Sequence, residues 1–338
     1  MYDIVRPVLF KIDPERAHSL TISLLRMAGA VSPLRNLLLR YYRAPSKPVH
    51  AFGLQFPNPV GLAAGYDKDG TAWKGSAALG FGHIELGTVT LHPQHGNPTP
   101  RIFRLPAERA LINRMGFPSR GAHFVADQVA SSRPPHLILG VNLGKNASTP
   151  IETAVEDYLE LMHIFAPKAD YLVINVSSPN TVGLRRLQAH TELNALLSSL
   201  VAEREVISAQ LERNIPLLVK LAPDLSTAEM DDALDVVLSN NLDGVIAANT
   251  TISRPGVKSV HADQVGGLSG APLYLLSLRM VKHINQVTAG KLPIIGVGGI
   301  MNADDAKNML AAGAVLVQIY TGLVYGGPGL VNSIISSL

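Results

Sequence analysis

Short apolar runs alternate with longer amphipathic segments along most of the chain. Each run has the length of a buried strand, and the segments between them repeat apolar residues at helical spacing. The eight runs cover residues 60–63, 83–87, 137–142, 171–175, 217–221, 244–248, 294–297 and 315–319. The helical patterns cover residues 151–165, 191–211, 227–238, 273–287 and 303–310, and a short extra strand is expected at 52–56. Strands joined by helical crossovers form parallel sheets, so the pattern predicts an α/β fold.

Eight strand–helix units in about 290 residues predict a (β/α)8 TIM barrel, with an open doubly wound sheet as the main alternative. The helical pattern before the first run is separate from this repeat. We therefore divide the chain into an N-terminal helical arm at residues 1–48 and a barrel domain at residues 49–338. In such a barrel the chemistry lies on loops after the carboxyl ends of the strands.

The arm, residues 1–48, is the most basic part of the chain. It carries eight basic and three acidic side chains, whereas the whole chain has a net charge of +3. Apolar spacing predicts two short amphipathic helices, near residues 20–28 and 32–42. Basic flanks and terminal tyrosines suit helices on an anionic bilayer, although two helices that cap a domain would look similar. Charges within residues 6–16 interrupt any secretory signal, so we expect the arm to be retained.

The C-terminal stretch, residues 310–338, contains no charged side chain and no histidine. It exceeds the roughly 20 residues that a membrane-spanning helix requires. Glycines and a proline divide it, however, into a β-branched run at 315–320, a turn and a short final helix. We therefore expect a buried strand, a loop and a helix here, and treat a membrane span as the minor alternative.

Composition narrows the class of protein. The 338 residues are 47% apolar and 16% charged, so the chain can bury a large core and is not disordered. The absence of cysteine excludes disulfides, thiolate metal sites and a cysteine nucleophile, and it is ordinary for a reducing compartment. The small net charge and the lack of a basic tail argue against nucleic acid. His92 and His95 have no acidic neighbour, so we expect no metal.

Small residues and carboxamides stand where the expected strands end. Residues 63–65 and Lys68 follow the first strand, while Asn142, Asn175 and Asn249 end or follow three others. In a barrel, these amides would converge on one cavity at the mouth. Carboxamides donate and accept hydrogen bonds, so they suit a neutral planar heterocycle, and the lysines suit an added anion.

Lys220 is a charged residue inside the apolar run 217–221. A buried ammonium is costly unless paired, which favours a functional role. Such a lysine can form a Schiff base or stabilise negative charge on a bound cofactor, and the residues leave both open. Glycine-rich turns at 296–300 and 320–322 predict a phosphate cradle. The Rossmann fingerprint is missing, which argues against a nicotinamide dinucleotide.

Ten motifs follow one another along the chain. They are LAAGYDKDG (62–70), ELGTVT (85–90), NRMGF (113–117), NLGKN (142–146), NVSSPNTVGLR (175–185), VKLAPDL (219–225), ANTT (248–251), GGLSG (266–270), IIGVGGI (294–300) and VQIYTG (317–322). Together with the arm they span essentially the whole chain, and the ordered set is far more specific than any single motif. In these motifs the chain resembles the dihydroorotate dehydrogenase family, specifically its membrane-associated, quinone-dependent class 2.

The resemblance implies one FMN per chain, oxidation of (S)-dihydroorotate to orotate, and a place in de novo pyrimidine biosynthesis. The implied FMN contacts are Ala63, Ala64, Gly65, Thr88, Asn142, Asn175, Lys220, Ala248, Gly270, Gly299, Tyr320 and Thr321. The implied substrate contacts are Lys68, Asn113, Arg114, Met115, Gly116, Phe117, Asn175, Asn180, Asn249 and Thr250. Lys68 would hold the substrate carboxylate. Ala248 stands where close relatives often have threonine, so a contact there would use its backbone.

Ser178 matches the family's catalytic base, which is cysteine in the soluble class 1. It would take the proton from C5 of dihydroorotate while hydride leaves C6 for flavin N5. Because a serine hydroxyl is a poor base, it must pass the proton to water or a neighbouring hydroxyl, beneath the loop 181–187. Lys220 would offset negative charge on the reduced flavin.

The resemblance also implies where the electrons go. A membrane quinone would be the final acceptor, reached by an apolar path between the arm helices. We expect a peripheral protein at the inner-leaflet lipid surface, on the cytoplasmic face of the cell membrane. We expect a monomer with no obligate protein partner and no nucleic acid.

Two other functions fit the same barrel. A Schiff-base aldolase or phosphate-ester isomerase would use Lys220 and the glycine turns without a flavin. A membrane-docked barrel would bind a nucleotide as a sensor and would not turn it over. The colour of the purified protein, and its response to dihydroorotate, separates these from the flavoenzyme.

Overall fold

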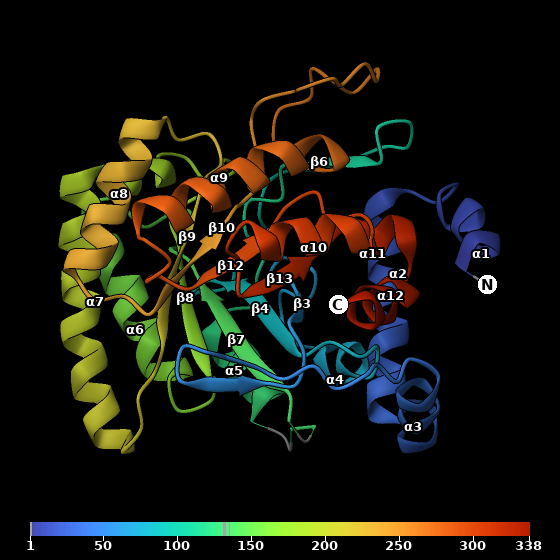
Figure 1. The fold of residues 1–338 in the computed structure, drawn as a ribbon, viewed down its shortest axis with the longest axis horizontal. Helices are drawn as coiled ribbons and strands as arrows, with labels where there is room; N and C mark the ends of the chain where they lie inside the picture. Colours follow the sequence, from blue (N-terminus) through green and yellow to red (C-terminus); the bar gives the residue numbers. More distant parts are fainter. Residues whose placement is uncertain (1, 131–132, 135) are drawn as a thin grey trace.

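Eight parallel strands close into a barrel at the centre of the molecule (Figure 1). The computed structural model describes residues 2–130, 133–134 and 136–338. In chain order the strands are β3 (Val60–Leu62), β4 (His83–Val89), β7 (Ile138–Leu143), β8 (Tyr171–Asn175), β9 (Leu217–Leu221), β10 (Gly244–Ala247), β12 (Ile294–Val297) and β13 (Leu316–Ile319). β13 pairs with β3 and closes the ring. Each strand lies on one of the eight apolar runs, so the TIM-barrel prediction is confirmed and the open sheet is wrong.

Helices surround the barrel and follow most of its strands. They are α4 (Trp73–Ala77), α5 (Ala122–Val129), α6 (Ala154–Phe165), α7 (His190–Leu211), α8 (Thr227–Ser239), α9 (Tyr274–Val287), α10 (Ala303–Ala311), α11 (Thr321–Gly326) and α12 (Gly329–Ser337). The 3-10 turns η1 (Leu184–Gln188) and η2 (Ala271–Leu273) precede α7 and α9. The five helical patterns predicted for the barrel are confirmed to within three residues at either end. Among the described residues, no helix combines the length and hydropathy that a membrane crossing requires.

A hairpin closes the amino end of the barrel. β1 (Val49–Ala51) pairs antiparallel with β2 (Leu54–Phe56). The single strand expected at 52–56 is wrong, because Phe52 and Gly53 both adopt positive φ angles and reverse the chain. Phe52 and Phe56 are buried, and the Phe56 ring meets His83 edge-on inside the barrel. These aromatic side chains fill the end of the barrel opposite the predicted chemistry.

A small antiparallel sheet lies over the carboxyl end of the barrel. It consists of β5 (Ile102–Leu105), β6 (Ala110–Asn113) and β11 (Gly267–Gly270), in the order β11-β6-β5. In it, Asn113 lies opposite Gly267, 154 residues further along the chain. This sheet was not predicted, because its pairing joins distant segments of the chain. The sheet forms one wall of the barrel mouth.

The arm forms three helices rather than the two expected. These are α1 (Tyr2–Leu9), α2 (Pro14–Ala30) and α3 (Ser32–Tyr41), which lie beside α11, α12 and α4 at one side of the barrel (Figure 1). Arg101 pairs with Glu15 at 2.6 Å, and Arg104 donates to the carbonyls of Phe10 and Ile12. Large apolar side chains nevertheless remain exposed on the arm: Ile4, Val5, Val8, Leu20, Leu24, Met27, Val31, Leu34, Leu37, Leu39 and Tyr41.

Glycines let α2 approach the barrel at its crossing with α4. An added Cβ at Gly75 would lie 2.0 Å from the carbonyl oxygen of Leu25, and one at Gly29 would lie 2.6 Å from the Gly75 nitrogen. We expect Gly75→Leu to force the helices apart, lower the free energy of unfolding by about 1–3 kcal/mol and make the arm sensitive to protease. Gly329→Leu is the matched control, because no atom lies within 4 Å of a Cβ there. Equal protease sensitivity of the two variants would contradict this packing.

Candidate functional site

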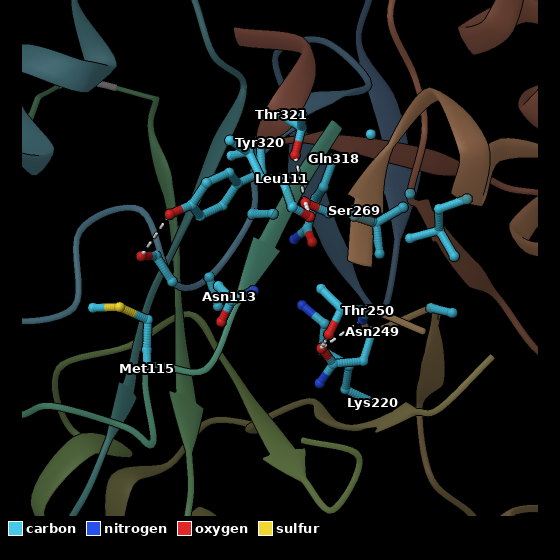
Figure 2. Close-up of a pocket in the computed structure, with 18 of the residues that line it drawn as sticks. Leu111, Asn113, Met115, Lys220, Asn249, Thr250, Ser269, Gln318, Tyr320 and Thr321 are labelled. Atoms are coloured by element: carbon cyan, nitrogen blue, oxygen red, sulfur yellow. Dashed lines mark hydrogen bonds between the residues drawn. The ribbon is translucent and has the colours of Figure 1, made fainter. Parts of the chain in front are cut away.

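A cavity opens at the carboxyl ends of the barrel strands, beneath the small sheet. It encloses about 1120 Å³, counted to its open mouth. Figure 2 shows Asn113 and Met115 on one side, with Lys220, Asn249 and Thr250 on another. Nineteen of the implied contact residues line it: Ala63, Ala64, Gly65, Lys68, Thr88, Asn113, Met115, Gly116, Phe117, Asn175, Asn180, Lys220, Ala248, Asn249, Thr250, Gly270, Gly299, Tyr320 and Thr321. Asn142, Ser178 and Arg114 do not.

The carboxamides at the strand ends form one hydrogen-bonded network. Asn175 Nδ2 donates to Thr88 Oγ1 at 2.9 Å and to Asn142 Oδ1 at 3.0 Å. Asn142 is fully buried behind the cavity wall, where its oxygen also accepts from Thr88 at 2.5 Å. Asn249 Nδ2 donates to Ser177 Oγ at 2.9 Å, and Ser177 Oγ donates to Asn175 Oδ1. Each amide is therefore held in one orientation before any ligand binds.

A buried carboxylate lies behind Lys220. Glu85, on β4, is fully buried, and its Oε1 lies 3.6 Å from Lys220 Nζ. Asn142 Nδ2 donates to Oε1 and Gln318 Nε2 to Oε2, each at 2.7 Å. Glu85 was not among the predicted site residues, although it is a charged residue inside an apolar run, as Lys220 is. The pair keeps both charges compensated inside the barrel.

Lys68 lies in the loop after β3, at the rim of the cavity. Its ammonium donates to the Gly65 carbonyl at 2.6 Å. Burial lowers the Lys68 pKa to about 8. The loop is fixed by Asp67, which accepts from the backbone N–H groups of Thr71 and Ala72, and burial raises the Asp67 pKa to about 6. Lys68 is therefore a positioned cation whose one hydrogen-bond partner among the described residues is the Gly65 carbonyl.

Ser178 stands just behind the cavity wall, after β8. It is buried, and its hydroxyl oxygen accepts from the backbone N–H of Asn180 at 3.2 Å. Asn180 in turn donates from Nδ2 to Asn113 Oδ1 at 3.2 Å, which ties this loop to the small sheet. Thr181 Oγ1 is buried with no hydrogen-bond partner among the described residues. This loop therefore carries two buried hydroxyls three residues apart, that of Ser178 and that of Thr181, and hydroxyl groups can relay a proton.

Arg185 holds the Ser178 loop in place. Its guanidinium donates to the Ser177 carbonyl at 3.0 Å, to the Asp224 carboxylate at 2.8 Å and to the Thr250 carbonyl at 3.1 Å. The loops after β8, β9 and β10 are thus joined at one side chain. Arg185 belongs to the motif at 175–185, but its role could not be predicted because two of its partners, Asp224 and Thr250, come from distant segments.

Arg114 is turned away from the cavity. Its guanidinium donates to Gln264 Oε1 at 2.9 Å and to the Pro100 carbonyl at 3.1 Å, and it covers the Phe103 ring. Its neighbours Asn113 and Met115 reach the cavity instead. The guanidinium therefore supports the turn that carries them, and it cannot contact a ligand in this conformation.

The predicted phosphate cradle lies at the ends of β12 and β13. Gly298 and Gly299 have φ angles of 116° and 75°, which favour glycine. A Cβ at Gly299 would lie 2.4 Å from the backbone of Tyr274, so no other residue fits there. The hydroxyls of Thr321 and Ser269 are 2.8 Å apart on the facing side. Backbone amides and hydroxyls of this kind suit a phosphate group.

A second, apolar cavity separates the arm from the barrel. It encloses about 1450 Å³, counted to its opening, and is lined by α1, α2, α3 and the edge of the barrel. Ile102, Leu111 and Tyr320 line both cavities, so these side chains stand between them. His18 lines it too and meets Tyr66 edge-on, and burial lowers the His18 pKa to about 3, which leaves the ring neutral. An apolar molecule from the arm side can therefore reach the wall of the first cavity.

Comparisons with known proteins agree on one family. A family model described as Dihydroorotate dehydrogenase matches residues 48–338. A protein from Herminiimonas arsenicoxydans described as dihydroorotate dehydrogenase (quinone) is 47% identical, over 100% of this chain and 97% of its own length. One of the same description from Methylococcus capsulatus is 48% identical, over 98% and 97%.

Solved structures give the same result for the fold. The crystal structure of DHODH in complex with ferulenol from Eimeria tenella matches with a TM-score of 0.85 at 37% identity, covering 96% of this chain and 90% of that chain. The ligand-free form from the same organism matches with a TM-score of 0.81 at 38% identity, covering 92% of each.

Proposed function

The chain belongs to the dihydroorotate dehydrogenase family, and we propose that it oxidises (S)-dihydroorotate to orotate in de novo pyrimidine biosynthesis. FMN would be the hydride acceptor and a membrane quinone the final electron acceptor. One observation carries the proposal: nineteen residues that the family resemblance implicates meet in one cavity, and a second, apolar cavity shares a wall with it. A paired ammonium is not a nucleophile, so the contact of Lys220 with Glu85 argues against a Schiff-base aldolase.

The cavity fits FMN by its own chemistry. Gln318 lines it and has a buried Oε1 with no partner among the described residues, which suits an N–H donor of a heterocycle. The glycine turn at 298–299 suits the phosphate, and Lys220 suits the polar edge of the ring. When bound, FMN accepts hydride from the substrate and passes the electrons to the quinone. The residues proposed to hold it, besides Asn142 behind the wall, are Ala63, Ala64, Gly65, Thr88, Asn175, Lys220, Ala248, Gly270, Gly299, Tyr320 and Thr321.

The remaining polar residues of the cavity would hold the substrate. Lys68 supplies a cation for the carboxylate, and Asn113, Asn180 and Asn249 supply donors and acceptors for the ring amides. The network around Asn175 holds Asn249, and a hydrogen bond from Asn180 to Asn113 holds those two amides. These groups are therefore oriented before the substrate binds. Arg114 would act by supporting residues 113–117, because its guanidinium points elsewhere.

Ser178 would remove the proton from C5 of dihydroorotate, and to do so its loop would have to turn the hydroxyl from behind the wall into the cavity. Its hydroxyl must first lose its own proton, and the unpartnered hydroxyl of Thr181 offers a route, directly or through water. Burial of both residues keeps bulk solvent from the reacting carbon. Arg185 would keep the serine loop against Thr250 while the substrate is bound.

The arm would supply the route for the quinone. Its exposed apolar side chains and its eight basic residues suit an inner-leaflet surface that carries anionic lipids. A quinone entering between α1 and α2 would meet the apolar cavity and, at its end, the shared wall of Ile102, Leu111 and Tyr320. The proposed location is the cytoplasmic face of the cell membrane, with peripheral attachment.

The ammonium of Lys68 makes substrate binding pH-dependent. Its pKa of about 8 means that the cation is present below that pH and is lost as the pH rises through it. A carboxylate binds the protonated form, so we expect kcat/KM for dihydroorotate to fall above pH about 8, by up to roughly tenfold per unit. Lys68→Gln should raise KM and remove this falling limb, whereas Lys74→Gln, outside the cavity, should keep it. A limb that persists in Lys68→Gln would contradict the assignment.

Absorbance spectroscopy of the purified full chain tests the proposed function. We expect a yellow protein whose flavin band is bleached anaerobically by dihydroorotate and restored by a quinone, with one orotate formed per cofactor reduced. A colourless protein that is active as an aldolase or a phosphate-ester isomerase would instead support that function. A yellow protein that dihydroorotate cannot reduce would support a binding module. Either result would overturn the proposal.

A further inference from the structure

Glu85 is a charged side chain that the proposed chemistry leaves without a role. It lies on β4 inside the barrel, fully buried, and does not line the cavity. Three side chains saturate its carboxylate: Asn142 and Gln318 donate to it at 2.7 Å, and Lys220 Nζ lies 3.6 Å away. Lys220 and Gln318 line the cavity themselves. Glu85 is therefore one side chain removed from any ligand that Lys220 touches.

The other titratable groups next to Glu85 carry no charge near neutral pH. Burial lowers the pKa of His83, two residues earlier on the same strand, to about 3. Burial, and then the Glu85 charge, raise the pKa of Tyr171 well above its usual value. Lys220 is the one cation paired with Glu85 among the described residues. Among these buried side chains, Glu85 and Lys220 together therefore determine the electrostatic field in the cavity.

We propose that Glu85 is the counter-ion of Lys220 and lowers the electron affinity of the cofactor bound against that lysine. This inference rests on the proposed FMN site. A lone lysine cation at the cavity wall would strongly favour electrons on the cofactor, which helps the substrate half-reaction but hinders transfer to a quinone. A carboxylate 3.6 Å behind the ammonium cancels part of that field at low dielectric. Glu85 acts through Lys220 and is a positioning residue.

The variant Glu85→Gln removes this charge with little change of shape. One carboxyl oxygen of Glu85 accepts from Asn142, and the other accepts from Gln318 Nε2. In the variant, the new amide nitrogen would face Gln318. A rotation of the Gln318 amide would restore that hydrogen bond, but it would also turn Gln318 Nε2 to the place that Oε1 now occupies. The matched control is Tyr171→Phe, which removes a buried hydroxyl from the same interior, next to Gln318, and changes no charge.

The test is the midpoint potential of the bound flavin, measured on the holoenzyme by anaerobic dye titration. At a fixed ambient potential we expect the ratio of reduced to oxidised cofactor to rise roughly tenfold in Glu85→Gln, which is about 30 mV for a two-electron couple. Tyr171→Phe should stay within about twofold of the wild type. A folded, yellow Glu85→Gln protein with the wild-type potential, or an equal shift in Tyr171→Phe, would overturn the proposal.

The free energy of unfolding, measured with denaturant, is a second test, and it does not require a bound flavin. Removing one partner of a buried ion pair leaves an uncompensated charge, whereas removing both does not. We expect the double variant, Glu85→Gln with Lys220→Gln, to be more stable than Glu85→Gln alone. If Glu85→Gln alone does not fold, the double variant should still fold. A double variant no more stable than the single one would overturn the pairing. A colourless wild type would refute the FMN site, and the unfolding comparison would still test the pair.

Discussion

Replacing Ser178 by alanine should slow reduction of the bound flavin by dihydroorotate roughly 10²- to 10⁴-fold, with the flavin still bound. The hydroxyl is the only group lost, and Ser178 is not part of the cavity wall that would hold the cofactor. Its buried oxygen accepts from the Asn180 N–H, which a water molecule or a slight loop shift can satisfy. Anaerobic stopped-flow absorbance measures the step directly, without the quinone half-reaction.

Two further variants separate a proton-transfer role of Ser178 from a structural one. Ser178→Cys restores a base whose ordinary pKa is roughly 8.5, so its rate should rise with pH towards that value. Thr181→Val removes the unpartnered hydroxyl and should cause a smaller loss than Ser178→Ala. A rate for Ser178→Ala within about threefold of the wild type would show that another group takes the proton.

Deleting residues 1–43 should abolish turnover with a long-chain quinone while dihydroorotate still reduces the flavin. The arm forms most of the apolar cavity, whereas the substrate cavity is built from residues 63 onward. Removing the arm also removes the apolar surface that would hold the protein at the membrane. The two half-reactions are measured separately, by anaerobic flavin reduction and by quinone reduction in lipid vesicles.

A point variant tests the same route in the intact chain. Ala17 lines the apolar cavity, and Ala17→Phe should fill part of it and impair quinone turnover. Ser19→Phe adds the same ring to an exposed position two residues further along α2 and should leave turnover near the wild-type value. For the deletion of residues 1–43, turnover with long-chain quinone equal to that of the wild type would refute the assigned route.

The barrel could be predicted because each of its strands is a short apolar run separated from the next by a helical pattern. The same logic failed for the small sheet, where β6 and β11 depend on a partner 154 residues away. It also missed α1, a short helix with a proline inside it. Hydrophobic periodicity indicates that a segment is buried, but it does not indicate which distant segment packs against it.

The candidate site, like the fold, was predicted only in part. Strand ends converge in any barrel, so Asn142, Asn175 and Asn249 could be brought together before their contacts were known. The orientation of Arg114 could not, because it depends on Gln264 and Phe103. Glu85 was overlooked because its role becomes visible only beside Lys220, which is on another strand.

A crystal structure of the full chain grown with FMN and orotate tests the central claim most directly. We predict a flavin ring against Lys220 and orotate between that ring and Ser178, with the orotate carboxylate on Lys68. Well-ordered crystals in which the mouth of the barrel excludes the ring system, or in which the flavin binds elsewhere, would contradict the account.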